Sequence, residues 1–238
     1  MRYAIGDIHG CLETFLQLLK EIEFTKDDTL YILGDMVDRG PKSAQVVDTI
    51  IKMIDNGYDV NVILGNHEDL MIKAIEDKKV EYIWARNGAW KTLESYGAKF
   101  EGYGSAPWYE VISMKHWNFL KSLPRKIVLD DYILVHAGLN TYLTDPINKT
   151  DDYDLTWIRD VDFNYDKNLL GGRTIISGHT ITSKQEIIQL NEEFKSQIII
   201  DNGCFLAKNN TYGPNYGSLC SFCLDSRTLH FTPCIDFN

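Results

Sequence analysis

Six side chains of types that bind metal ions follow short apolar runs at five places along the chain. They are Asp7, His9, Asp35, Asn66, His136 and His179. Asp7 and His9 are two residues apart in an extended segment, so their side chains point the same way and can reach one cation together. Asp35 has two carboxylate oxygens and can bind one ion through each. The pattern therefore predicts a site for two divalent cations.

Each of these residues also has an ordinary structural explanation when it is taken alone. An Asp or Asn after a strand is usually a turn former or a helix cap, and a single His is usually a core or surface residue. Four of the six histidines, however, lie beside glycines at the ends of apolar runs, and independent caps would not gather them in this way. These four are His9, His67, His136 and His179.

Five apolar runs that stop at polar or small residues are the elements that must position these side chains. The runs are residues 3–10, 31–40, 62–68, 133–138 and 175–180. Each predicts a buried strand that leads into a loop. Apolar spacings of three and four predict helices over 12–22 and 43–54. Strand, helix and strand in this order imply parallel units, whose ligands gather at the carboxyl ends of the strands.

The C-terminal third has little helical periodicity. Residues 197–202, 216–224 and 227–232 predict strands joined by turn-rich stretches. We therefore expect a second sheet, formed here and packed on the first. No repeat or linker rich in Pro, Gly and Ser interrupts the chain, so we expect one α/β domain over residues 1–238.

Charge and composition narrow the choice of partners and compartment. A net charge of -10 and a pI near 5.0 argue against a nucleic-acid partner, which normally needs a basic surface. No run of eighteen uncharged apolar residues and no signal segment is present, so we expect a cytoplasmic protein without a membrane partner, and a monomer. We expect the five cysteines to be reduced thiols rather than a disulfide framework. Cys220 and Cys223 form a lone CxxC that is typical of a strand here.

Five short motifs resemble the PPP family of metal-dependent serine/threonine protein phosphatases, within the calcineurin-like metallophosphoesterase superfamily. They are GDIHG (6–10), GDMVDRG (34–40), GNHE (65–68), HAG (136–138) and GHT (178–180). The resemblance extends from residue 3 to about residue 203 and is closest to the short bacterial and phage members. It implies a four-layer α/β/β/α sandwich with central mixed β-sheets and flanking helices.

The resemblance also implies how the ligands are shared between two cations. Asp7, His9 and Asp35 would hold one ion, and Asp35, Asn66, His136 and His179 the other. Two divalent ions against two carboxylates leave the site positive, which acidifies a bridging water and attracts a phosphate. Direct attack by that hydroxide would need no phosphoenzyme. Manganese is the expected metal, with iron and zinc as alternatives.

Five residues are expected to bind the phosphate or to support proton transfer to its leaving group. The resemblance implies that His67 protonates the leaving oxygen and that Asp38 orients His67. The Arg39 guanidinium can grip two phosphoryl oxygens. Arg159, in LTWIRD, resembles the family's second phosphate-binding arginine, and an ordinary surface ion pair is its alternative. Asn66 is expected to contact the phosphate as well as the metal.

The substrate is less well defined than the chemistry. We expect a phosphatase for phosphoserine and phosphothreonine in proteins or peptides, with phosphotyrosine as a further substrate. The alternative is a symmetrical diadenosine tetraphosphatase or another nucleotide phosphohydrolase. Asp38 and Glu68, within intact VDRG and GNHE motifs, favour the protein phosphatase. A catalytically dead binding protein is a third class, and the complete ligand set argues against it. The segment 84–97 could border the substrate groove or form the core of a helix.

Overall fold

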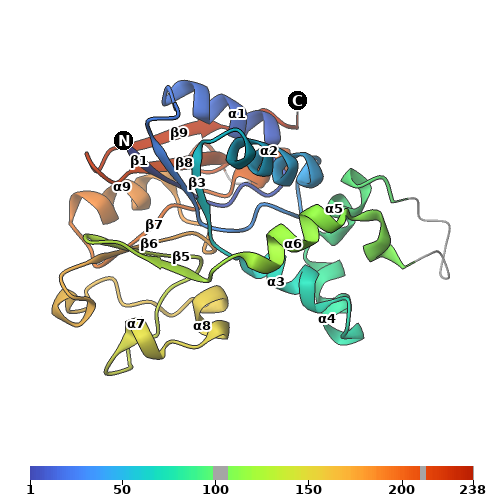
Figure 1. The fold of residues 1–238 in the computed structure, drawn as a ribbon. Helices are drawn as coiled ribbons and strands as arrows, with labels where there is room; N and C mark the ends of the chain where they lie inside the picture. Colours follow the sequence, from blue (N-terminus) through green and yellow to red (C-terminus); the bar gives the residue numbers. More distant parts are fainter. Residues whose placement is uncertain (99–106, 210–212, 238) are drawn as a thin grey trace.

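The computed structural model describes residues 1–98, 107–209 and 213–237. Two mixed β-sheets lie face to face, with helices outside them (Figure 1). The first sheet has the order β3 (Asp59–Val62), β2 (Thr29–Ile32), β1 (Arg2–Ile5), β8 (Ser218–Cys223) and β9 (Leu229–Pro233). The second has the order β4 (Lys126–Val128), β5 (Tyr132–Val135), β6 (Thr174–Ser177) and β7 (Gln197–Ile199). The predicted α/β architecture of two mixed sheets with flanking helices is confirmed.

The strands are apolar on both faces because each sheet is covered on both sides. Helices α1 (Leu12–Glu21) and α2 (Ser43–Asp55) pack on the outer face of the first sheet and bury Ile5 of β1. The neighbouring residue, Ala4, points the other way, into the core between the two sheets. The outer face of the second sheet buries Ile133 against Leu155 of α8 (Asp152–Trp157). These contacts give the four layers.

The C-terminal strands join a different sheet from the one expected. Strand β8 pairs antiparallel with β1, and β9 pairs with β8, so both extend the first sheet. Only β7 belongs to the second sheet, which is completed by β4, β5 and β6. The expectation that these strands form a separate second sheet was therefore wrong. Periodicity predicts a strand but not its partner across more than 200 residues.

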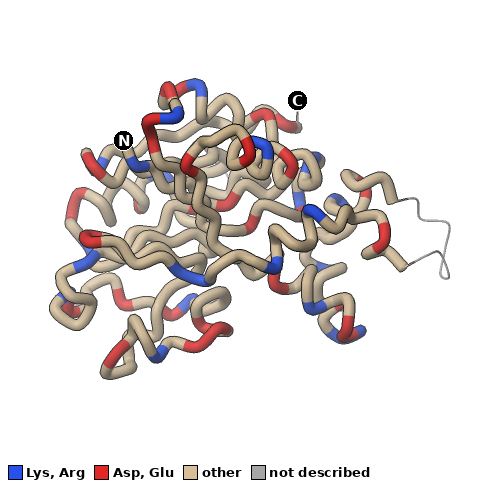
Figure 2. Tube along the Cα trace, in the orientation of Figure 1, with Lys and Arg blue, Asp and Glu red and all other residues tan. Residues whose placement is uncertain are grey.

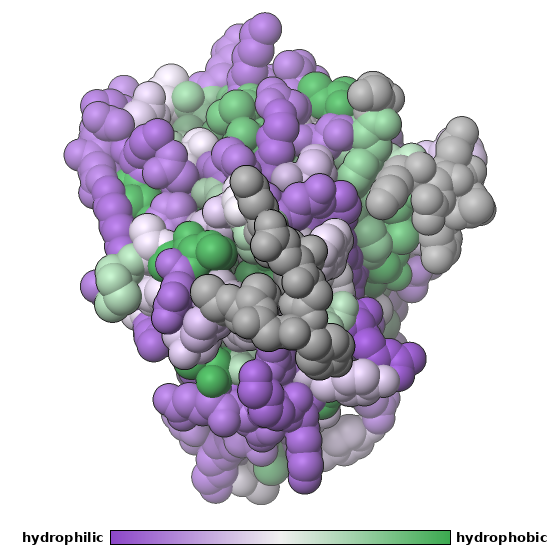
Figure 3. All heavy atoms as spheres, turned by 90° about the vertical axis from the view of Figure 1, so that its right-hand side faces the viewer, coloured by the Kyte–Doolittle hydropathy of each residue, from purple (hydrophilic) through white to green (hydrophobic). Residues whose placement is uncertain are grey.

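A helical lobe follows β3 and lies to one side of the sandwich (Figure 1). It contains α3 (Asn66–Lys73), α4 (Lys78–Arg86), α5 (Ala89–Ser95), η1 (Trp108–Val111) and α6 (Met114–Ser122). Segment 84–97 forms the end of α4, a turn at Gly88 with φ +104°, and α5. Trp84 is buried, which agrees with the helix-core alternative, whereas Trp90 is 48% exposed. Apolar side chains reach the surface on this side as separate patches among hydrophilic ones (Figure 3).

The remaining elements are short helices in the second half of the chain. They are α7 (Pro146–Lys149), η2 (Lys167–Leu170), α9 (Lys184–Glu192) and η3 (Cys204–Asn209). Acidic and basic residues are interspersed along the chain, mostly in loops and at helix ends (Figure 2). No helix in the described ranges is long and apolar enough to cross a membrane.

The C-terminal segment fastens both ends of α1. At the start of the helix, the Asp236 carboxylate accepts the backbone N–H groups of Glu13 and Thr14 at 2.9 Å each. It replaces the side-chain cap that Cys11, the N-cap residue, does not provide. At the other end, Glu21 accepts hydrogen bonds from His230 and Thr232 of β9.

Candidate metal centre and acid dyad

The six predicted metal ligands converge at one edge of the sandwich, where strands of both sheets end. None is more than 6% exposed. Asp35 lies between the others, with Oδ2 3.6 Å from His9 Nε2 and Oδ1 3.5 Å from His136 Nε2. Asp7 Oδ2 lies 3.9 Å from the same nitrogen of His9. A carboxylate in this position can contact a cation on each side, as the bridging role predicted for Asp35 requires.

The loops that carry these side chains have an unusual backbone. Eight non-glycine residues in the described ranges have a positive φ, and five of them are predicted site residues. The five are His9, Asp35, Asp38, Arg39 and His179. This conformation costs an L-residue roughly 1–2 kcal/mol, so the surrounding structure must hold it. The strain is concentrated where side chains are aimed at the centre.

Glu68 is the group that holds the strained loop after β2. Its carboxylate accepts the backbone N–H groups of Asp35 at 2.9 Å, Met36 at 2.8 Å and Val37 at 3.1 Å. It also accepts the N–H of Gly65, the residue before α3, at 3.1 Å. The sequence drew attention to Glu68 as part of a motif but did not predict this anchoring role.

Two glycines leave space for the ligand carboxylates. A Cβ at Gly65 would lie 2.2 Å from Asp35 Oδ1, and a Cβ at Gly178 would lie 2.1 Å from Asp7 Oδ1. Both distances are far below van der Waals contact, so any side chain here would push a carboxylate out of place. Each glycine directly precedes a predicted ligand, Asn66 or His179.

The hydrogen bonds of the histidines indicate that the centre fits a cation. Nδ1 of His9 donates to Val37 O at 2.8 Å, and Nδ1 of His136 donates to Leu33 O at 2.7 Å. Each ring then presents a lone pair on Nε2. His136 Nε2 lies 2.8 Å from Asn66 Oδ1, so two lone-pair-bearing atoms face each other. His9 Nε2 is buried and has no hydrogen-bond partner among the described residues. Cations between these atoms would satisfy them.

The protonation states point the same way. Burial lowers the pKa of His9 and His136, and it lowers the pKa of His179 to about 3. All three rings are therefore neutral near pH 7, as metal ligands must be. Burial raises the pKa of Asp7 and brings the pKa of Asp201 to about 6. Nearby cations would keep both carboxylates ionised. Asp201, at the end of β7, was not among the predicted site residues.

His67 and Asp38 form a buried pair next to the metal ligands. His67 Nδ1 lies 2.6 Å from Asp38 Oδ2. Burial alone would lower the pKa of His67, but the carboxylates of Asp35 and Asp38 outweigh it and raise that pKa. His67 Nε2 faces the Arg39 guanidinium at 3.0 Å, and this guanidinium stacks on the Phe205 ring 4.3 Å away. The structure thus brings together His67, Asp38 and Arg39, the residues predicted to be the acid, its orienting carboxylate and a phosphate-binding arginine.

Arg159 lies at the exposed rim of the centre. Its Nη1 is 3.5 Å from Thr180 Oγ1, directly after His179. Its phosphate-binding role stays a prediction. Its hydrogen bond is with the GHT motif, whereas a surface ion pair was the alternative expected from the sequence.

Two further residues hold Asp38 and were missed by sequence reasoning. Trp84 Nε1 donates to Asp38 Oδ2 at 2.9 Å, and the Thr92 hydroxyl donates to Asp38 Oδ1 at 2.6 Å. The same hydroxyl accepts the N–H of Asp38 at 2.8 Å. Helical spacing predicts that Trp84 is buried, but no pattern indicates where its N–H points.

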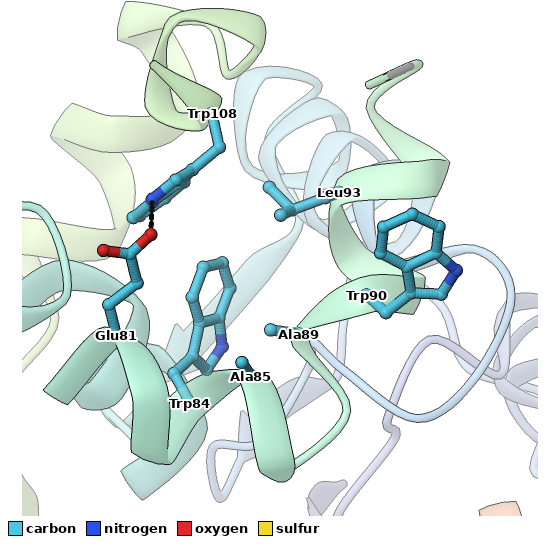
Figure 4. Close-up of a pocket in the computed structure, with 7 residues that line it drawn as sticks. All are labelled: Glu81, Trp84, Ala85, Ala89, Trp90, Leu93 and Trp108. Carbon is cyan, nitrogen blue, oxygen red and sulfur yellow. Dashed lines mark hydrogen bonds between the residues drawn. The ribbon is translucent and has the colours of Figure 1, made fainter. Parts of the chain in front are cut away.

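A pocket of about 200 Å³ lies on the other side of Trp84. Its walls are mostly aromatic and apolar, and Trp108 donates to Glu81 at one side of it (Figure 4). The lining residues are Glu81, Trp84, Ala85, Ala89, Trp90, Leu93 and Trp108. Segment 84–97 therefore contributes both to the support of the dyad and to a surface cavity.

The predicted carboxylate, imidazole and amide ligands meet at the shared edge of two stacked mixed sheets, beside the His67–Asp38 pair and two arginines. This arrangement is that of a metal-dependent phosphoester hydrolase. The chain matches the calcineurin-like phosphoesterase family over residues 3–199 and belongs to it. The calcineurin-like part of the expected resemblance is confirmed, and membership of the PPP protein phosphatases within it stays a prediction.

Curated relatives share a limited segment with this chain. A symmetrical bis(5'-nucleosyl)-tetraphosphatase of Chromobacterium violaceum is 46% identical over 76 residues, which are 32% of this chain and 26% of the relative. The corresponding protein of Salmonella typhimurium LT2 is 45% identical over 74 residues, 31% of this chain and 25% of that protein. The matches thus span about a quarter of the relatives' length.

Solved structures share the fold over nearly the whole chain. A protein proposed to be a diadenosine tetraphosphatase has a TM-score of 0.67 at 20% identity, covering 99% of this chain and 94% of that one. A serine/threonine phosphatase of Saccharomyces cerevisiae has a TM-score of 0.57 at 15% identity, covering 98% and 80%. Likeness at this level of identity shows the fold and leaves the substrate open.

Proposed function

We propose that this phosphoesterase hydrolyses dinucleoside tetraphosphates symmetrically, to two nucleoside diphosphates. The observation that carries the proposal is the identity of 45–46% with symmetrical bis(5'-nucleosyl)-tetraphosphatases over 74–76 residues. This identity favours the nucleotide phosphohydrolase, the alternative expected from the sequence, over the phosphoprotein phosphatase. Both activities would use the same metal centre, and their substrates differ in the groups attached to the phosphate.

In the proposed mechanism the protein's own residues bind the phosphate, orient the acid and protonate the leaving oxygen. Two divalent ions, held by the six ligands, would supply Lewis acidity and positive charge. Arg39 and Arg159 bind the non-bridging oxygens of the phosphate under attack. When Arg39 turns to the anion it leaves His67 Nε2, which then carries a proton to the leaving oxygen. Asp38 keeps that ring oriented through Nδ1.

Hydrolysis of phosphoserine and phosphothreonine is the second candidate, and the acid dyad favours it. A serine or threonine alkoxide is a much poorer leaving group than a nucleoside diphosphate, so it gains more from a proton donated by His67. The buried His67–Asp38 pair, fixed by Trp84 and Thr92, suits such a substrate. Manganese remains the metal we propose for either reaction.

A direct comparison of substrates tests the proposal. Steady-state kcat/KM is measured with diadenosine tetraphosphate, a phosphoserine peptide and a phosphotyrosine peptide, at one saturating concentration of Mn²⁺. We expect the dinucleotide to be preferred by at least about tenfold, a difference of about 1.4 kcal/mol in transition-state binding, with ADP as the only nucleotide product. Preference for either peptide, or release of AMP and ATP, would overturn the assignment while leaving the hydrolase class intact.

A further inference from the structure

Three cysteine side chains from distant parts of the chain meet outside the metal centre. Cys11 directly precedes α1 as its N-cap residue, Cys204 begins η3, and Cys234 directly follows β9. Their sulfur atoms all lie within 4.8 Å of one another, and those of Cys11 and Cys234 are 3.8 Å apart. All three are free thiols. None belongs to the lone CxxC that the sequence singled out.

We propose that Cys11, Cys204 and Cys234 form a binding site for one thiophilic metal ion, such as Zn²⁺ or Cu⁺. Thiolates bind Zn²⁺ at about 2.3 Å, which places two ligand sulfurs about 3.8–4.0 Å apart in tetrahedral or trigonal geometry. The observed separation of Cys11 and Cys234 falls in this range. Small movements within the 4.8 Å limit would bring Cys204 to the same distance.

The surroundings suit a soft cation and an all-sulfur ligand set. Cys11 and Cys204 are at most 1% exposed and belong to the apolar core, so the sulfurs are shielded from hard oxygen ligands. Cys234 is half-buried, which gives an ion a path from solvent. Each thiol releases its proton to solvent as its sulfur takes the ion, and three thiolates with Zn²⁺ carry a net charge of -1. That charge lies at the positive end of α1.

An ion in this three-cysteine site would connect the C-terminal segment to both loops behind the metal centre. Cys11 is two residues after His9. Cys204 precedes Phe205, whose ring contacts the His9 ring at 5.1 Å and the Arg39 guanidinium. The site is distinct from the phosphoesterase centre, since no predicted ligand there is a cysteine.

Titration with Cd²⁺ tests the site in the reduced protein of residues 1–238, with Mn²⁺ already saturating the phosphoesterase centre. Thiolate-to-cadmium charge transfer absorbs in the ultraviolet, and oxygen and nitrogen ligands do not produce this band. We expect the band to saturate at one equivalent, with a rise in the melting temperature. Cys234→Ser, at the half-buried position, should abolish both responses and leave the fold intact.

Cys220→Ser is the matched control, because Cys220 is as buried as Cys204 but lies outside the cluster. It should retain the band and the shift in melting temperature. Absence of a band in the folded wild-type protein, or an undiminished band in Cys234→Ser, would overturn the proposal. Either outcome is independent of the substrate assigned above.

Discussion

Trp84 Nε1 donates a hydrogen bond to the Asp38 oxygen that also accepts from His67 Nδ1, at 2.9 Å and 2.6 Å. The tryptophan therefore fixes the carboxylate that orients the proposed acid. Trp84 is 46 positions away in the helical lobe outside the sandwich, and its side chain connects that lobe to the His67–Asp38 pair. This relationship leads to the first prediction.

Trp84→Phe keeps the ring in the core and removes its N–H. Loss of one hydrogen bond to a carboxylate costs roughly 1.5–3 kcal/mol, so kcat should fall by about tenfold or more on a substrate with a poor leaving group. An activated aryl phosphate needs little proton donation and should lose much less. Equal losses on both substrates would mean that Trp84 acts on stability alone. Trp90→Phe, in the same pocket but 48% exposed, is the control.

His67→Ala removes the proposed proton donor. General acids contribute about 10²–10⁴-fold, so turnover of an alkyl phosphate should fall by about a hundredfold or more. Metal content should stay near the wild-type value, because the predicted ligands are untouched. Kinetics and elemental analysis on the same preparation separate the two effects. Unchanged turnover would remove His67 from the role of acid.

Gly65→Ala should disable the centre through a steric effect. Its Cβ would lie 2.2 Å from Asp35 Oδ1 and 2.7 Å from Glu68 Oε2, so the carboxylates must move. We expect a loss of roughly 1–3 kcal/mol in the free energy of unfolding, and severe loss of metal affinity. Gly57→Ala has no atom within 4 Å of its new Cβ and carries only the backbone cost of φ +82°. Retained metal affinity in Gly65→Ala would contradict the geometry.

Removal of divalent ions should lower stability, because it leaves lone pairs of His9, His136 and Asn66 facing one another or unpartnered. A ligand at a hundred times its Kd stabilises the folded state by about 2.7 kcal/mol, which a thermal melt resolves. Mn²⁺ should restore the melting temperature and give the highest activity among Mn²⁺, Fe²⁺ and Zn²⁺. Asp35→Asn should lose most of the shift, whereas the exposed Asp55→Asn should retain it.

Glu21 makes a pH-dependent link between α1 and β9. Hydrogen bonds from His230, Thr232 and Gln17 lower its pKa to about 2. A lowered pKa in the folded state gives stability that is present above the unfolded value, about 4.3, and is lost as pH falls toward 2. The melting temperature of Glu21→Gln should therefore lie below that of wild type above pH 5, and the difference should vanish near pH 2. A constant difference across this range would show that the charge is irrelevant.

Much of the fold follows from local patterns. The helices expected over 12–22 and 43–54 are α1 and α2. Each of the five apolar runs overlaps the end of a strand, although the run 62–68 shares only Val62 with β3 and continues into α3. The candidate ligands could be chosen because parallel strands present their carboxyl ends on one edge. Here that edge is shared by two sheets, not one.

The interactions that no pattern predicted are long-range side-chain contacts. Helical spacing allowed Trp84 to be a core residue and no pattern singled out Thr92, yet both bind Asp38. The three cysteines are separated by 193 and 30 residues, and no spacing rule relates them. Such contacts depend on how elements pack, which periodicity does not encode.

The pairing of β1 with β8 makes the assembly of the first sheet depend on residues more than 200 positions further along the chain. While the chain is being synthesised, residues 2–62 can form their β-α-β units, but β1 is left as an open edge until residues 218–233 have emerged. The N-terminus of α1 likewise lacks its cap until Asp236 has been made. Until β8 has been made, β1 presents an unpaired strand edge to which another chain could bind.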